Sequence, residues 1–135
     1  MAHRPLPRRG ANAVEFGLTL PVFMAILLGL VDYGWLFAAQ AGIDNATAIA
    51  CREGSMIDER LGNPYNIANT ELVTRAAPWC DLADSCIHDA ADAGYPVPDK
   101  AIRCEVTMDF RPLIGFVPVP DQIDSISYYR MEWQR

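Results

Sequence analysis

A long apolar stretch near the amino terminus dominates the pattern of hydrophobic and polar residues. Residues 16–31 carry no charge, and after Asp32 residues 33–43 carry none either. A bilayer core about 30 Å thick needs roughly 20 helical residues, which the first run reaches with a few neighbours from either side. The pattern predicts one long apolar helix over residues 11–54, whose membrane part, at about residues 14–37, contacts membrane lipid. Asp32 is then expected near one face of the membrane.

Proline and glycine mark further features of this helix. Pro21 lacks an amide donor and clashes with the carbonyl of Gly17, so a bend is expected at Gly17 and Pro21. Small residues also recur at every fourth position and form a ridge that lets another helix approach closely. They are Gly34, Ala38, Gly42, Ala46, Ala50 and Gly54. Gly54 is expected to end the helix in a left-handed conformation.

The remaining residues, 55–135, have the mixed composition of a small folded domain. A short helix is expected over residues 70–77, starting at Asn69 or Thr70 and ending before Pro78.

Two extended segments follow. Apolar residues alternate along residues 102–110, and a second extended segment is expected at residues 123–133. Residues 112–121 are rich in turn formers and join the two as a long antiparallel hairpin. We therefore expect an α+β fold in which a small sheet packs against the outer half of the long helix.

Charge is distributed unevenly along the chain. Eleven basic and seventeen acidic residues give a net charge of −6, yet the leader at residues 1–10 holds Arg4, Arg8 and Arg9 and no acid. By the positive-inside rule, this leader is expected to lie in the cytoplasm and the carboxyl-terminal domain outside it. A single-pass membrane protein is expected. Nucleic acid is not expected as a partner, because no stretch rich in Lys or Arg follows the leader.

Four cysteines are expected to form two disulfides, since the space outside the cytoplasm is oxidising and the domain is small. Three pairings are possible. We favour Cys80 with Cys86, which closes a short loop, and Cys51 with Cys104, which ties the helix end to a strand. A zinc site is the rival interpretation, with His88 close to Cys86, but paired CxxC or CxxH spacing is missing.

No other chemistry is indicated. Asp81, Asp84, Asp89 and Asp92 lie close together but lack EF-hand spacing, so they are interpreted as a solvated acidic surface. The chain has two histidines and no GxSxG, HExxH or phosphate-binding glycine loop. We therefore expect no enzymatic activity, no catalytic residue, no metal and no cofactor.

The junction between the leader and the apolar stretch carries a distinctive motif. It reads Arg8-Arg9-Gly10-Ala11, with Glu15 at the fifth position after the glycine. This motif resembles a type IV prepilin processing site, where a membrane aspartic peptidase cuts after the glycine on the cytoplasmic side. The resemblance implies cleavage between Gly10 and Ala11. It also implies that the Glu15 carboxylate neutralises the free amino group of a neighbouring subunit during assembly and sets axial register.

A longer series of motifs resembles the TadE-like family of minor pseudopilins, which belong to tight-adherence (Tad, Flp-type) pilus systems. The motifs are RGANAVEF at residues 9–16, LP at 20–21, VDYG at 31–34 and ACREG at 50–54. Gly17, Thr19 and Cys51 depart from the residues that are common in the family. None of these departures touches the processing motif.

This resemblance implies a function and a set of partners. The function is that of a minor pilin that takes part in pilus assembly, adhesion and surface colonisation. The partners are a prepilin peptidase, the major Flp-type pilin, a sister minor pilin and the inner-membrane assembly platform. The resemblance also implies a single-pass protein of the inner membrane with its carboxyl-terminal domain in the periplasm. After assembly, the processed subunit is also expected in the extracellular pilus.

The alternative is a small disulfide-bonded binding protein outside the cytoplasm. Its apolar segment then serves as an uncut signal anchor, or as a Sec signal that is cut after Ala41. The apolar stretch is long for a signal peptide and Asp32 interrupts it, which favours the minor pilin.

Overall fold

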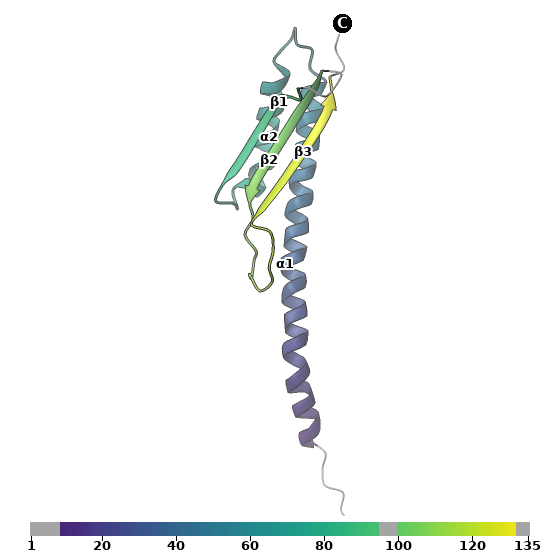
Figure 1. The fold of residues 1–135 in the computed structure, drawn as a ribbon, viewed down its shortest axis with the longest axis vertical. Coiled ribbons are helices and arrows are strands. Elements are labelled where there is room, and N and C mark those ends of the chain that lie inside the picture. Colours follow the sequence, from purple (N-terminus) through teal and green to yellow (C-terminus); the bar gives the residue numbers. More distant parts are fainter. Residues whose placement is uncertain (1–8, 95–99, 132–135) are drawn as a thin grey trace, which may run out of the picture.

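The computed structural model describes residues 9–94 and 100–131, with the backbone alone for residues 9–11. The elements are α1 (Arg9–Ser55), α2 (Pro64–Cys80), β1 (Cys86–Asp92), β2 (Ala101–Asp109) and β3 (Gln122–Arg130). Figure 1 shows α1 running almost the whole length of the molecule, with the other elements gathered along its carboxyl-terminal half. This arrangement confirms the α+β prediction. The leader arginines Arg4 and Arg8 lie outside the described residues, as does the end of the segment expected at residues 123–133.

The sheet has three antiparallel strands in the order β1-β2-β3. In the central strand, Cys104 lies opposite Ala90 of β1 and Ser127 of β3. β2 and β3 form the long hairpin that the alternating pattern predicted; each starts one residue before the expected position, and β3 ends at Arg130.

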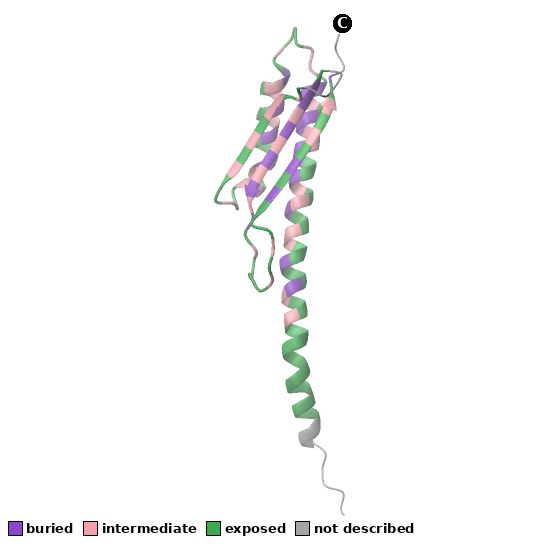
Figure 2. Cartoon of the chain, viewed as in Figure 1, coloured by how far each residue is buried: buried purple, intermediate pink, exposed green. Residues whose placement is uncertain are grey.

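Both helices cover one face of this sheet, with α1 over β2 and β3 and α2 over β1. The buried residues of β2 alternate along the strand, so one of its faces meets the helices. The core between the layers contains Ile43, Ala50 and Cys51 of α1, Ala68 and Leu72 of α2, and Ile102, Cys104, Val106 and Ile123 of the sheet. Figure 2 shows that burial is confined to the carboxyl-terminal part of α1, whereas its amino-terminal part is exposed.

The second helix is longer than the sequence predicted and begins at a different residue. Its N-cap is Asn63, whose side chain accepts hydrogen bonds from the backbone N–H groups of Tyr65 and Asn66. Pro64 occupies the first helical turn, where its missing N–H costs nothing. The prediction that this helix begins at Asn69 or Thr70 is therefore wrong.

Pro78 also fails to stop α2, which continues to Cys80. The helix buries Pro64, Ala68, Leu72 and Ala76 at four-residue spacing, so packing over the whole length outweighs the local effect of one proline near its end.

The carboxyl-terminal part of the ridge of small residues forms the contact seam between α1 and α2. A Cβ at Gly42 would overlap the indole ring of Trp79, and a Cβ at Gly54 would lie 2.6 Å from the Cβ of Ala68. Ala46 and Ala50 between them are buried. Gly34, by contrast, has no atom within 4 Å of such a Cβ. The part of the ridge that packs against α2 therefore runs from Gly42 to Gly54, and Ala38 is exposed.

The prediction that Gly54 ends the helix in a left-handed conformation is wrong. It lies inside α1, which continues to Ser55, and the positive φ angles among the described residues belong to Gly94 and Gly115. Gly54 is needed instead for the close approach of α2.

Strand β1 was not predicted. Its residues were interpreted as a polar loop with an acidic surface, yet Cys86–Asp92 pairs with β2 along its full length. β1 is an edge strand with exposed and partly buried residues, so it lacks the strong alternation that reveals β2.

Candidate functional site

The amino-terminal half of α1, up to Asp32, forms a bare segment, an apolar surface that the other described residues leave uncovered. Apolar side chains project all around it, among them Val14, Phe16, Leu18, Val22 and Ile26. In the described part of the chain, α1 is the one helix long and apolar enough to cross a membrane, and its most apolar window is not buried at all. A helix that is apolar on every side and lies outside the core is typical of a membrane span, so α1 has the properties of a single-pass anchor.

The charge-bearing side chain of this bare segment is Glu15. No residue with a described side chain forms an ion pair or hydrogen bond with its carboxylate. The nearby Thr19 hydroxyl donates to the backbone carbonyls of Glu15 and Phe16, at 3.1 and 3.2 Å, and so satisfies itself within the helix.

The predicted processing residues lie at the start of α1. Arg9, Gly10 and Ala11 belong to its first turn, and Arg8 precedes the described residues. The first four N–H groups of a helix have no partner within it, so this turn is held by fewer hydrogen bonds than the rest.

The helix is continuous through Pro21, where a bend was expected. Pro21 has no N–H to donate to the carbonyl of Gly17, and Gly17 has no atom within 4 Å of a Cβ placed on it. The bend at Gly17 and Pro21 stays a prediction.

Asp32 marks the point where the bare segment ends and the folded domain begins. Its side chain is fully buried and accepts hydrogen bonds from three consecutive backbone N–H groups, those of Ile114 (2.9 Å), Gly115 (3.4 Å) and Phe116 (3.0 Å). Next to it, the Tyr33 hydroxyl donates to the carbonyl of Pro118. The loop between β2 and β3 is thus fastened to α1 at this level.

Sequence reasoning placed Asp32 near a membrane face but missed its partner. The signal that could have found it is the run from Pro112 to Pro120, which contains no charged residue and has Gly115 at its centre. A glycine with φ of 72° lets successive N–H groups converge on one carboxylate.

Aromatic residues near Asp32 take two different positions. Trp35 packs against Trp79 of α2, with ring centroids 6.0 Å apart, and both are partly buried against the core of the domain. Phe37 remains exposed.

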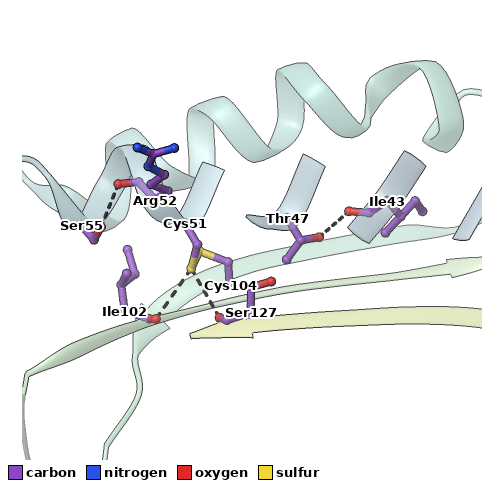
Figure 3. The surroundings of a disulfide bond; sticks show 8 residues. All are labelled: Ile43, Thr47, Cys51, Arg52, Ser55, Ile102, Cys104 and Ser127. Carbon is purple, nitrogen blue, oxygen red and sulfur yellow. Dashed lines mark hydrogen bonds between the residues drawn. A yellow bond between two sulfur atoms is a disulfide. The ribbon is translucent and has the colours of Figure 1, made fainter. Parts of the chain in front are cut away.

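Two disulfides tie the domain together, and they are the pairs favoured from the sequence. Cys51 of α1 is bonded to Cys104 of β2, and Cys80 is bonded to Cys86 between α2 and β1. Figure 3 shows the first bond between the helix and the sheet, with the Sγ of Cys51 3.4 Å from the carbonyl oxygen of Ser127. This bond fixes the end of the long helix to the central strand.

The acidic residues and His88 do not form a metal site in the structure. Asp84 pairs with Arg111, and Asp92 accepts a hydrogen bond from the backbone N–H of Gly94. Among the described residues, no group of three His, Cys, Asp or Glu side chains is arranged to hold a metal ion.

The comparison with protein families supplies an independent finding. The family model described as TadE-like protein matches residues 10–52. The match begins at Gly10 and covers almost all of α1, including Glu15, Asp32 and Cys51. No curated protein and no solved structure gives a match.

The TadE-like family is one of structural components of pili and is not known for catalysis. The match supports an association of this chain with the Tad pilus system. The motifs along α1 had led to the same family, so residues 10–52 are identified as a TadE-like segment.

Proposed function

We propose that this protein is a minor pilin of a Tad (Flp-type) pilus. It is a single-pass subunit of the inner membrane that a prepilin peptidase cuts between Gly10 and Ala11 and that then takes part in pilus assembly. The observation that carries the proposal is the bare apolar half of α1, which bears Glu15 and lies within the TadE-like match. It fits both an anchor and a surface for packing against other subunits.

The proposed processing step is hydrolysis of the peptide bond between Gly10 and Ala11. One water molecule is consumed, the leader leaves with a carboxylate on Gly10, and Ala11 gains a free amino group. The two residues lie in the first turn of α1, so few helical hydrogen bonds have to open for the backbone to extend in the peptidase. Arg8 and Arg9 keep this bond at the cytoplasmic surface.

Glu15 is proposed to act in assembly. Its carboxylate has no partner among the described side chains, and it lies on the segment that inserts into the membrane. A lone charge in apolar surroundings is costly, whereas a pair of opposite charges is much less so. Pairing with the amino group of Ala11 in a neighbouring subunit therefore favours one axial position over others.

The proposed partners follow from this role. They are the prepilin peptidase, the major Flp-type pilin, a sister minor pilin and the inner-membrane assembly platform. The domain at residues 55–135 lies in the periplasm before assembly and is carried into the pilus afterwards, where it serves adhesion and surface colonisation.

The Sec-secreted alternative is disfavoured by the packing of the domain. Cleavage after Ala41 would remove Ala39, which is buried in the core, together with Trp35 and Leu36, which pack against it. The domain is built around the helix that such a cut would sever. The packing of the domain does not distinguish an uncut signal anchor from a minor pilin, so the amino-terminal sequence of the protein has to be determined.

The first experiment determines the amino-terminal peptide of the protein from membranes of its native host by mass spectrometry. A peptide starting at Ala11 in the wild type, and an unprocessed chain in a Gly10→Leu variant, support the minor pilin. A Gly34→Leu variant is the matched control, because Gly34 is exposed on the same helix. An intact amino terminus in the wild type indicates a signal anchor, and a start at Gly42 indicates a secreted domain.

A second experiment tests Glu15 directly. A Glu15→Gln variant keeps the shape of the side chain and removes its charge. We expect normal processing but a loss of the subunit from sheared pili, measured by immunoblotting of pilus and membrane fractions. An Asp44→Asn variant on the exposed side of the same helix is the control. Incorporation of Glu15→Gln at the wild-type level would contradict the assigned role.

A further inference from the structure

The loop between β2 and β3 has a composition that is unusual for a loop in water. Residues 112–120 read PLIGFVPVP and contain no charged side chain and no side-chain hydrogen-bonding group. Leu113, Ile114 and Phe116 are exposed, at 61%, 47% and 55%. The charged residues Arg111 and Asp121 stand at its two ends. The loop therefore presents a compact apolar surface that the rest of the described structure leaves uncovered.

This loop is held against α1 at one level. The three N–H groups bound to Asp32, the hydroxyl of Tyr33 bound to Pro118, and the contact of Val117 with Gly29 all lie within two turns of the helix. A Cβ at Gly29 would lie 3.3 Å from a methyl carbon of Val117, so glycine permits this approach. Figure 1 shows the loop extending from the end of the sheet along the side of α1, toward its bare half.

The level of the loop coincides with the end of the membrane segment. Seventeen positions separate Glu15 from Asp32, which corresponds to about 26 Å of helix. The bilayer core is about 30 Å thick, so Glu15 and Asp32 lie near its opposite faces when α1 spans it. The apolar surface of the loop is continuous at this level with exposed Leu30 and Val31 of α1.

We propose that residues 112–120 form a second membrane contact, in which Leu113, Ile114 and Phe116 insert into the bilayer interface on the side where the folded domain lies. Asp32 is the positioning residue for this contact, because its carboxylate holds the loop at the correct depth. The same three hydrogen bonds satisfy a carboxylate that would otherwise be exposed at the edge of the apolar layer. The loop and α1 together fix the height and tilt of the domain above the membrane.

The composition of the loop favours lipid as the partner of its apolar surface. A bilayer interface accepts aliphatic and aromatic side chains of many shapes, and the charges at both ends of the loop mark the polar boundary. This inference rests on one part of the proposed function, the insertion of α1 in the membrane, and does not depend on processing or pilus assembly.

The test uses the full chain in nanodiscs of phosphatidylcholine and phosphatidylglycerol, with one protein in each disc, so that no neighbouring subunit is present. All four native cysteines are in disulfides, so a nitroxide label can be attached to a single added cysteine. Labels at Leu113→Cys, Ile26→Cys and Leu61→Cys are compared for collision with oxygen, which concentrates in lipid, and with a water-soluble nickel complex. Ile26 is the reference within the bilayer, and Leu61, 88% exposed on the domain, is the reference in water.

We expect the label at position 113 to resemble that at 26, with low nickel and high oxygen accessibility. If it resembles the label at 61 while the label at 26 reports lipid, the loop does not touch the membrane and the inference is wrong. If the label at 26 also reports water, the insertion of α1 is wrong and the inference falls with it. A label at 113 that is exposed to water in nanodiscs but protected in pili would assign the loop to a neighbouring subunit instead.

The role of Asp32 is tested with two variants. Asp32→Asn replaces an acceptor oxygen by a donor, so the label at 113 is expected to gain nickel accessibility. Gly115→Val leaves Asp32 in place but disfavours the positive φ of 72° that aligns the N–H groups, and the same gain is expected. Gly94→Val, at a φ of 66° in another loop, is the matched control. Unchanged depth of the label in both variants would show that Asp32 does not position the loop.

Discussion

Replacing Gly54 by alanine is expected to force α1 and α2 apart. A Cβ at this position would lie 2.6 Å from the Cβ of Ala68, 3.0 Å from the carbonyl oxygen of Pro64 and 3.0 Å from a methyl carbon of Ile102. One of these atoms is backbone and another is attached directly to it, so a rotamer change cannot relieve the contact. Overpacking of this kind typically costs about 1–3 kcal/mol.

The matched variant is Gly34→Ala in the same helix, where no atom lies within 4 Å of the added Cβ. Both substitutions gain the same helix propensity, about 1 kcal/mol, because both replace glycine by alanine inside α1. The difference in unfolding free energy between the two variants therefore isolates the packing at the helix seam. We expect Gly54→Ala to be less stable than Gly34→Ala by about 1–3 kcal/mol.

The assay is thermal unfolding of the full chain in detergent, followed by near-ultraviolet circular dichroism with both disulfides intact. For a chain of 135 residues, 1 kcal/mol corresponds to about 3–5 °C in Tm, so the two variants should differ by several degrees. Equal Tm values for Gly54→Ala and Gly34→Ala would refute the close approach of α1 to α2 at this glycine.

Three further changes test other parts of the structure. Asn63→Ala should lower the stability by about 1 kcal/mol in urea unfolding, because it removes the N-cap of α2. Asn69→Ala, inside the helix, should have little effect; the reverse order would contradict the observed start of α2. Replacing Cys51 and Cys104 by alanine should cost about 4 kcal/mol by loop entropy, roughly twice the loss expected for the shorter disulfide, as calorimetry can show. Burial and nearby carboxylates raise the pKa of Tyr65 above its ordinary value of 10.0. The neutral phenol is therefore favoured by the fold, and its contribution to stability is present below pH 10 and lost as the pH rises through the raised pKa. In the absorbance titration of tyrosinate, the step lost in Tyr65→Phe should lie above pH 10, and loss of a step at or below pH 10 would contradict the shift.

The predictions that succeeded rest on strong local patterns. The charge-free run at residues 16–31 and its neighbours fixed the long helix, since few other structures tolerate so many apolar residues in sequence. Alternation at residues 102–110 revealed β2, because this central strand has one face in the core and one outside. The family resemblance along α1 was likewise carried by short motifs in a fixed order, and the family comparison agrees with it.

The predictions that failed depended on contacts between distant segments. Gly54 has the local context of a helix end, yet it remains helical because Ala68 and Pro64 of another helix pack directly on it. Pro78 resembles a helix stop, yet α2 continues to Cys80. The edge strand β1 has weak alternation of its own and is specified mainly by pairing with β2.

The sequence by itself determined that this chain has an apolar helix of membrane-spanning length with a motif that resembles a prepilin processing site before it, because hydrophobicity, charge and short motifs are properties of consecutive residues. The tertiary structure alone decided which residues meet across the chain. It brought Asp32 to the N–H groups of a loop more than 80 positions later, and it turned a ridge of small residues into a helix seam. Such contacts depend on the register of packed elements, and the position of a buried carboxylate is decided by which donors surround it once the chain has folded.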